Sequence, residues 1–249
     1  MRIIVLFITM CIIINSAHST TVSITRHNCP ICRTQNSFQD IRSGYQAQFD
    51  LHQYLDWTYT QSYSVYCCTN CWYSALKLDF GIVPAEKLEL IKSFLKTLNF
   101  KNKYTDYAVI PVTIKLEIAE KIYWILGRND EFWCNFYRIL GFHYGEEQKQ
   151  EMAKAARFKA LLYSHLMLTD RHNKGREKEI YYIIATMNYF TGQEKSALLY
   201  LDKAAKYTYM NYTLTKEVSN AIDNRLSNFI DEYPNFIKEQ KYRNINVSN

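Results

Sequence analysis

The chain has 249 residues and a mass of 29.6 kDa, and its 48% hydrophobic and 22% charged residues exclude a disordered chain. Average usage would place about 17 Gly and 12 Pro in this length, but the sequence has 7 Gly and 4 Pro, too few turn residues for an all-β sandwich. The formal net charge of +6 is modest, and the sequence contains no run of five basic residues. We therefore expect no nucleic-acid partner.

The N-terminus has the pattern of a secretory signal peptide. Arg2 precedes an apolar run over residues 3–14, and the small residues Ala17 and Ser19 favour cleavage after Ser19. The apolar run is too short for a bilayer-spanning helix, which needs about 20 residues. We therefore expect residues 1–19 to be removed, and the mature protein to be secreted or periplasmic without a membrane anchor.

Residues 20–82 are expected to form a small Cys-rich head of short strands and loops. Apolar residues alternate here, as at Tyr63, Val65 and Cys67, instead of recurring at helical spacing. Large aliphatic residues are few, so this segment needs a cross-link to stay folded. Five of the seven cysteines lie in it: Cys29, Cys32, Cys67, Cys68 and Cys71.

Four of these cysteines form two CxxC pairs, Cys29-Pro30-Ile31-Cys32 and Cys68-Thr69-Asn70-Cys71. A CxxC pair can form a knuckle that points both thiolates to one side, and two knuckles supply the four sulfurs of tetrahedral Zn²⁺. The spacing therefore predicts a structural zinc ion on Cys29, Cys32, Cys68 and Cys71. Such a site is coordinatively closed and has no catalytic position.

Three other readings of the cysteines remain open. An exported protein meets oxidising conditions, so the six mature cysteines could form disulfides. Cys29 and Cys32 alone would suit a thiol-disulfide oxidoreductase, although the thioredoxin fold requires a β-α-β unit before its CxxC. His27 or His52 could replace one cysteine as a metal ligand. Cys67 and Cys134 are left over, and a bridge between them is another possibility.

Residues 83–249 are expected to form a helical domain, because apolar residues recur three and four apart. About seven helices are predicted, on short connections that favour antiparallel pairs. The first follows Pro84; the second follows Pro111 and stops at Gly127; Asp130 caps the third; the fourth covers about residues 146–170 with Met152, Ala155, Ala156, Leu162 and Leu166; two flank Gly192; and the seventh begins near Thr215 and stops before Pro234.

The pair around Gly192 resembles one tetratricopeptide repeat (TPR). Ala185 and Ala197 are twelve residues apart, where two helices of a hairpin touch and need small side chains. Asn188 stands where the pattern usually has an aromatic residue, and no second copy occurs at a period of 34. We expect an irregular TPR-like bundle or solenoid, since one repeat cannot bury its apolar face alone.

These features together resemble a bacterial family of unknown function. The resemblance lies in Cys29-Pro30-x-Cys32, Phe38, Tyr66, Cys68-x-x-Cys71-x-Tyr73-x-Ala75 and Asp79-Phe80, followed by the TPR-like helices. It implies a zinc-ribbon-like head on a helical domain, with zinc on the four CxxC cysteines. The family's knuckles usually have Gly after the second Cys, where this chain has Arg33 and Trp72.

The sequence contains no catalytic pattern that we recognise: no HExxH, GxSxG, P-loop or Gly-rich dinucleotide turn. The leading functional hypothesis is an exported interaction module, in which a zinc-stabilised head joins a helical scaffold whose concave face binds a protein or peptide. The alternatives are a thiol-disulfide oxidoreductase and a secreted protein held by disulfides.

Overall fold

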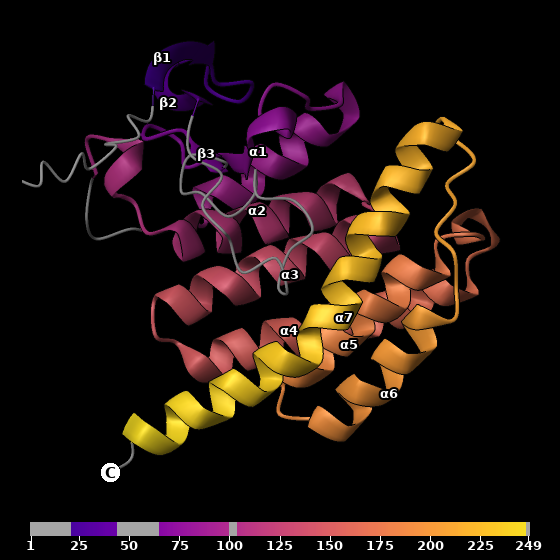
Figure 1. The fold of residues 1–249 in the computed structure, drawn as a ribbon. Helices are drawn as coiled ribbons and strands as arrows, with labels where there is room; N and C mark the ends of the chain where they lie inside the picture. The colour runs from indigo at the N-terminus through magenta and orange to yellow at the C-terminus, as the bar shows by residue number, and fades with distance from the viewer. Residues whose placement is uncertain (1–20, 44–64, 100–103, 248–249) are drawn as a thin grey trace, which may run out of the picture.

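The computed structural model describes residues 21–43, 65–99 and 104–247, which form a small β head followed by seven α-helices (Figure 1). The predicted fold class is confirmed, whereas the predicted signal peptide lies outside the described residues. The strands are β1 (Thr21–Asn28), β2 (Gln35–Ser43), β3 (Val65–Cys67) and β4 (Ser74–Leu76). The helices are α1 (Leu88–Lys96), α2 (Val112–Leu126), α3 (Asp130–Glu146), α4 (Gln150–Thr169), α5 (Glu177–Phe190), α6 (Glu194–Ala205) and α7 (Lys216–Val247). Short 3-10 turns are η3 (Lys77–Asp79), η4 (Ala85–Lys87), η5 (Tyr107–Val109) and η6 (Arg171–Asn173).

The head consists of two antiparallel hairpins, β1–β2 and β3–β4. The last paired residues of the first are Asn28 and Gln35, and those of the second are Cys67 and Ser74. The turns between them are residues 29–34 and 68–73, which we call the first and second knuckle. Each CxxC pair therefore lies in the turn of its own hairpin.

Aromatic rings form the core of the head. The Phe38 and Tyr66 rings stack at 3.9 Å between centroids, and Phe80 meets Phe38 edge-on at 4.9 Å. The Tyr107 ring of η5 packs against Phe38 at 4.7 Å, which brings the helical part into the same core. The division at residue 82 stays a prediction, but head and first helices share one hydrophobic cluster.

A hydroxyl group of α2 fixes the second hairpin to the helices. Tyr123 accepts a hydrogen bond from the Leu76 backbone N–H at 2.8 Å and donates to Asp79 at 2.9 Å. Asp79 also pairs with Arg128 at 3.0 Å. Because Tyr123 is fully buried, these bonds hold β4 in a defined place on α2.

Several predicted helix ends are confirmed. Pro84 leads through η4 into α1, and Pro111 immediately precedes α2. Gly127 ends α2 with φ of 74°, a left-handed conformation that glycine adopts without steric cost. Gly192 has φ of 86° between α5 and α6. These ends were predictable because proline restricts, and glycine extends, the range of backbone dihedral angles that a residue can adopt.

The ends of α3 were predicted incorrectly. Its N-cap is Asn129, whose side chain accepts from the Phe132 N–H at 3.0 Å, and not Asp130, which is the first helical residue. Its C-terminus extends to Glu146, where the fourth helix was expected to begin. Gln148 then takes φ of 60° while the Lys149 N–H donates to the Tyr144 carbonyl, a Schellman-type end that usually has glycine.

The buried face of α4 also differs from the prediction. Met152, Leu162 and Leu166 are exposed, although they were expected to form the apolar face. Of the predicted face only Ala156 is buried, together with Ala153 and Ala160, whereas Ala155 is exposed. Small side chains allow α4 to approach α3 closely, since a Cβ added at Gly141 would lie 3.3 Å from the Ala153 carbonyl oxygen.

The residue pattern of α5–α6 that resembles a TPR has a counterpart in α3–α4. Ala185 and Ala197 are fully buried between α5 and α6. In the α3–α4 pair, Gly141 and Ala153 are also twelve residues apart and stand 44 residues before them. The matching positions in α3–α4 are Tyr137, Leu140, Gly141, Tyr144, Ala153 and Ala160; those in α5–α6 are Tyr181, Ile184, Ala185, Asn188, Ala197 and Ala204. The fold is compatible with a TPR-like stack, and the 20-residue α4 lengthens the period beyond the 34 residues of the usual repeat.

The last helix does not stop before Pro234, as predicted, but continues to Val247. Proline has no N–H for the Ile230 carbonyl, which normally weakens a helix. The buried Tyr233 and Ile237 on either side of this break outweigh that loss, because α7 packs them in a core with Tyr182 of α5. No helix in the described part of the chain combines the length and apolarity needed to cross a membrane.

Candidate metal centre

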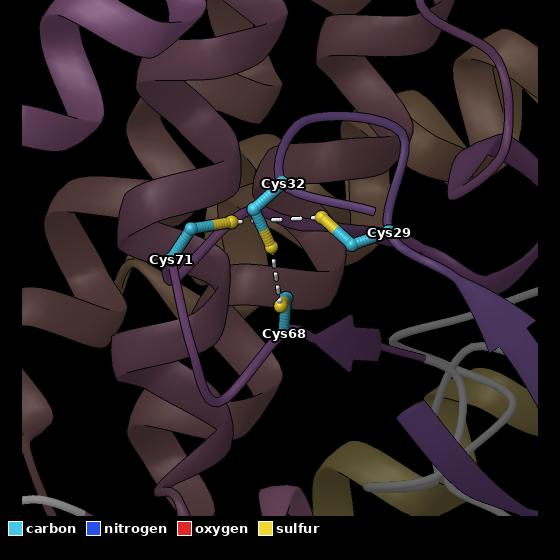
Figure 2. Close-up of side chains that lie close together, drawn as sticks. All are labelled: Cys29, Cys32, Cys68 and Cys71. Atoms are coloured by element: carbon cyan, nitrogen blue, oxygen red, sulfur yellow. Dashed lines mark hydrogen bonds between the residues drawn. The ribbon is translucent and has the colours of Figure 1, made fainter. Parts of the chain in front are cut away.

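The two knuckles bring the sulfurs of Cys29, Cys32, Cys68 and Cys71 together, as Figure 2 shows. The Cys29 and Cys71 sulfurs are 3.5 Å apart, and those of Cys32 and Cys68 are 3.6 Å apart. All four lie within 4.8 Å of one another. Every described cysteine is a free thiol, since a disulfide requires about 2.05 Å between sulfurs. The two CxxC pairs thus form one cluster.

The same backbone hydrogen bonds close both knuckles. In the first, the Cys29 N–H donates to Thr34 O at 2.9 Å and the Arg33 N–H donates to Cys29 O at 3.0 Å. In the second, the Cys68 N–H donates to Tyr73 O at 2.9 Å and the Trp72 N–H donates to Cys68 O at 2.8 Å. The two loops therefore present their sulfurs in the same way, although they share only the cysteines.

The residue after each CxxC has a left-handed backbone. Arg33 has φ of 65° and Trp72 has φ of 66°, a conformation that favours glycine. A residue with a Cβ loses roughly 1–2 kcal/mol there. Trp72 gains packing in return, because its ring meets Tyr104 at 5.8 Å between centroids. The exposed Arg33 has no ring contact among the described residues, so no such packing offsets the cost of its left-handed backbone.

Polar groups around the cluster donate to its sulfurs. The Ile31 N–H donates to the Cys29 sulfur at 3.4 Å, and the Asn36 side-chain amide donates to the Cys68 sulfur at 3.5 Å. Asn36 is 7% exposed and also donates to Thr34 O at 2.9 Å. Sequence reasoning missed Asn36, since an asparagine in a strand after a CxxC gives no signal until the hairpins meet.

The crowded thiols hold their protons unevenly. A hydrogen bond between Cys29 and Cys68 raises the pKa of Cys29 to about 12. The same bond, and one with Cys71, lower the pKa of Cys68 well below its usual range, because a thiolate is stabilised by thiols that donate to it. Hydrogen bonds with Cys29 and Cys68 raise the pKa of Cys71. Burial alone would raise the pKa of Cys32, but hydrogen bonds with Thr34 and Asn70 lower it. The cluster therefore favours negative charge on Cys68 and Cys32, which a bound cation would extend to the other two sulfurs.

This donor set fits zinc. Four sulfurs at 2.3 Å from a tetrahedral zinc ion would be about 3.8 Å apart, close to the 3.5 and 3.6 Å found between the knuckles. Soft thiolates select Zn²⁺, Cu⁺ or iron–sulfur clusters over hard cations. Small rotations of the four cysteine side chains would therefore place their sulfurs around one ion.

One side of the cluster is open to solvent. Cys29 and Cys68 are fully buried, whereas Cys32 and Cys71 are half-buried. These two sulfur-bearing residues line a cavity of about 520 Å³ between the knuckles and α1. The other lining residues include Trp72, Lys92, Leu95 and Lys96.

The remaining candidates that the structure describes are not part of the cluster. Cys67 is buried, and burial raises its pKa to about 12; the same cause raises the pKa of Cys134 to about 12 in α3. The considered bridge between them is not formed. The His27 ring packs near the rings of Phe38 and Tyr66, at 5.9 and 5.6 Å between centroids. His52 lies outside the described residues.

Comparisons with known proteins agree with the resemblance seen in the sequence. Searches of curated proteins and of solved structures found no match. Residues 24–228, which include both knuckles and all helices up to the middle of α7, match the model of the family described as "Uncharacterized protein conserved in bacteria" (DUF2225). The chain therefore belongs to this bacterial family.

Proposed function

We propose that the protein is an exported interaction module whose head is held together by one structural zinc ion. The observation that carries the zinc assignment is the convergence of four sulfurs from two separate hairpins. Cys29 and Cys32 would bind the ion from the first knuckle, and Cys68 and Cys71 from the second. When bound, zinc supplies a cross-link and no open coordination position.

The head has a physical need for this cross-link. The β3 and β4 strands have three residues each, too few for a hairpin that is stable alone. Hydrogen bonds among the thiols also raise the pKa values of Cys29 and Cys71, which zinc would offset by binding the thiolates. The metal therefore stabilises the contact between the hairpins and contributes directly to folding.

Metal analysis of the reduced protein tests this assignment. We expect about one zinc per chain in the wild type and less than a tenth of that in Cys68→Ser. The matched control is Cys134→Ser, which also removes a buried sulfur but one that is remote from the cluster, and it should keep its zinc. Wild-type protein that stays metal-free after reduction and incubation with zinc would contradict the proposal.

The helical part is proposed to bind a protein or peptide. The α7 helix covers the aromatic side of α5, where Tyr233 meets the rings of Tyr182 and Tyr189 at 6.0 and 5.8 Å. A partner would therefore use another face. On α4, Phe158, Leu162 and Leu166 are four residues apart and are 42%, 59% and 40% exposed. This stripe (Phe158, Leu162 and Leu166) suits an apolar partner surface.

Co-purification from the native host tests the stripe. A partner that binds the wild type and Leu78→Asp, but not Leu162→Asp, would support the assignment. Leu78 is the control because it is 75% exposed in the head, far from α4 in sequence. Equal binding by all three proteins, or binding by none, would remove the stripe from the proposal.

Export is the remaining part of the proposed function. We expect the mature chain to begin at Thr20 and to be recovered outside the cytoplasm, because residues 1–19 have the pattern of a signal peptide. N-terminal sequencing after cell fractionation tests both points. A cytoplasmic protein that retains Met1 would contradict export without affecting the zinc assignment.

A further inference from the structure

The four sulfurs differ in how accessible they are, and each accessible sulfur has a buried neighbour. Cys71, which is half-buried, lies 3.5 Å from the buried Cys29. Cys32, also half-buried, lies 3.6 Å from the buried Cys68. Both contacts run from one knuckle to the other, as the dashed lines in Figure 2 show. Each accessible sulfur therefore has a partner placed to react with it.

We propose that a hydroperoxide converts this cluster into two disulfides between the knuckles, Cys29–Cys71 and Cys32–Cys68, with release of the metal. This inference rests on the proposed function for the metal, but the pairing follows from the sulfur positions alone. Oxidation is then a reversible modification of the head. It differs from the chemistry of a CxxC oxidoreductase, which forms its disulfide within one motif.

The reaction balances with hydroperoxide as the oxidant. The Cys32 thiolate attacks one peroxide oxygen, the O–O bond breaks, and hydroxide leaves with a sulfenic acid on Cys32. The Cys68 sulfur then attacks the Cys32 sulfur, the S–O bond breaks, and the second hydroxide leaves. In the metal-free cluster each hydroxide takes one of the two thiol protons to give water; in the zinc-bound cluster, where the sulfurs are already thiolates, each hydroxide takes its proton from solvent. One peroxide accepts two electrons per disulfide, so the two pairs consume two peroxides.

Access to solvent decides which sulfur is attacked first. Cys32 and Cys71 line the 520 Å³ cavity beside α1, so a small oxidant can reach them without opening the head. Cys29 and Cys68 have no exposed surface. The accessible residue of each pair is thus the attacking thiol, and the buried residue is the one that resolves the sulfenic acid.

The proposed pairing keeps the two hairpins joined. Cys29 and Cys71 are 42 positions apart, and Cys32 and Cys68 are 36 apart. Disulfides that close such loops restrict the unfolded chain far more than disulfides within CxxC motifs, which would leave the hairpins unconnected. The head is therefore cross-linked by zinc when reduced and by disulfides when oxidised, and its shape is retained.

Peroxide titration with peptide mapping tests the proposal on the full zinc-loaded chain. We expect zinc release, followed with a chromophoric chelator, to be complete at about two peroxides per chain. Mass spectrometry of a thiol-blocked digest should then show Cys29–Cys71 and Cys32–Cys68 as the main disulfides. Reduction with a dithiol should restore zinc binding. Cys134→Ser should behave as the wild type does, because its sulfur lies outside the cluster.

Other outcomes would overturn the pairing. Disulfides within the motifs, Cys29–Cys32 and Cys68–Cys71, would contradict it and favour an oxidoreductase. Sulfinic acids on Cys32 and Cys71 without disulfides would contradict it too. In Cys29→Ser, the sulfenic acid of Cys71 should persist and react with a dimedone probe several times more than in the wild type; no increase would count against Cys29 as the resolving residue.

The test separates this inference from the metal assignment. Protein that never binds zinc but gives the two expected disulfides would overturn the proposed zinc site and support the pairing. Protein that binds one zinc and keeps it through excess peroxide would do the reverse. The two results cannot be confused, because zinc content and disulfide connectivity are measured separately.

Discussion

The Asn36 side-chain amide donates to the Cys68 sulfur across the interface between the two hairpins, at 3.5 Å. Asn36 belongs to β2, whereas Cys68 opens the second knuckle, so this bond joins the hairpins before any metal is considered. The same amide donates to Thr34 O in the first knuckle. One buried side chain therefore positions both loops.

Replacing Asn36 should weaken metal binding. In Asn36→Ala, the Cys68 sulfur loses a donor that stabilises its thiolate, so we expect zinc affinity to fall about 10- to 100-fold, the usual effect of losing a group that supports a ligand. Competition with a chelator of known affinity measures this change. The control is Ser37→Ala, at the neighbouring exposed position of the same strand. Equal affinities in both variants would show that Asn36 serves packing alone.

Glycine at position 33 should stabilise the head. Arg33→Gly relieves a left-handed strain of roughly 1–2 kcal/mol, while the added freedom of glycine in the unfolded chain returns about 0.5–1 kcal/mol. We expect a net gain of about 0.5–1 kcal/mol in the free energy of unfolding, measured by chemical denaturation. Arg33→Ala keeps the strain and should show no gain. A gain of the same size in Arg33→Ala would assign the effect to the lost charge.

Lys115 should make stability depend on pH. It is fully buried in α2, and burial lowers its pKa to about 8, although Cys67 and Asp106 act in the opposite direction. Between about pH 8 and the usual lysine pKa near 10.4, the unfolded chain binds a proton that the folded chain does not, so this group makes stability rise with pH. Below pH 8 its full penalty remains.

Lys115→Met should remove that penalty. We expect the variant to be more stable than the wild type by about 1–3 kcal/mol at pH 7, and the difference to shrink as pH rises toward 10. Denaturation curves at several pH values measure it. Lys121→Met, at an exposed position of the same helix, should show a small difference that does not change with pH. A constant gap in Lys115→Met would contradict the pKa assignment.

Pro234→Ala should stabilise α7. Alanine restores a donor for the Ile230 carbonyl and removes the proline ring from the helix interior, worth up to about 3 kcal/mol, of which the freer unfolded chain returns up to about 1 kcal/mol. We expect a net gain of about 1–2 kcal/mol in thermal or chemical denaturation. Asn235→Ala controls for general helix propensity and should gain less. Destabilisation by Pro234→Ala would mean that the break in α7 is required for its packing.

Some parts of the fold could be predicted because their causes are local. The spacing of Cys29, Cys32, Cys68 and Cys71 predicted one cluster, and the left-handed Gly127 predicted the end of α2. The helix-breaking rules failed at Gln148 and Pro234. A helix ends at Gln148 without a glycine, whereas another helix continues through Pro234. At both places tertiary packing outweighs the preference of the residue, which a sequence pattern alone does not reveal.

The outward side of α4 was misjudged for a related reason. Periodicity placed Leu162 and Leu166 in the core, but close approach to α3 at Gly141 required alanines there instead. A helix with apolar residues on two sides cannot be oriented from its sequence. The matching pattern in α3–α4 was missed because it stands 44 residues before that of α5–α6, and not 34.

Each knuckle is the turn of its own hairpin, which affects the order in which the head is assembled. Hairpins form within about 1–10 μs, since they need only short loops to close. Joining the two knuckles is slower, because it brings together residues 36 and 42 positions apart and loses the entropy of that loop first. In the zinc-bound protein that we propose, the ion would offset part of that entropy, because it binds both knuckles at once.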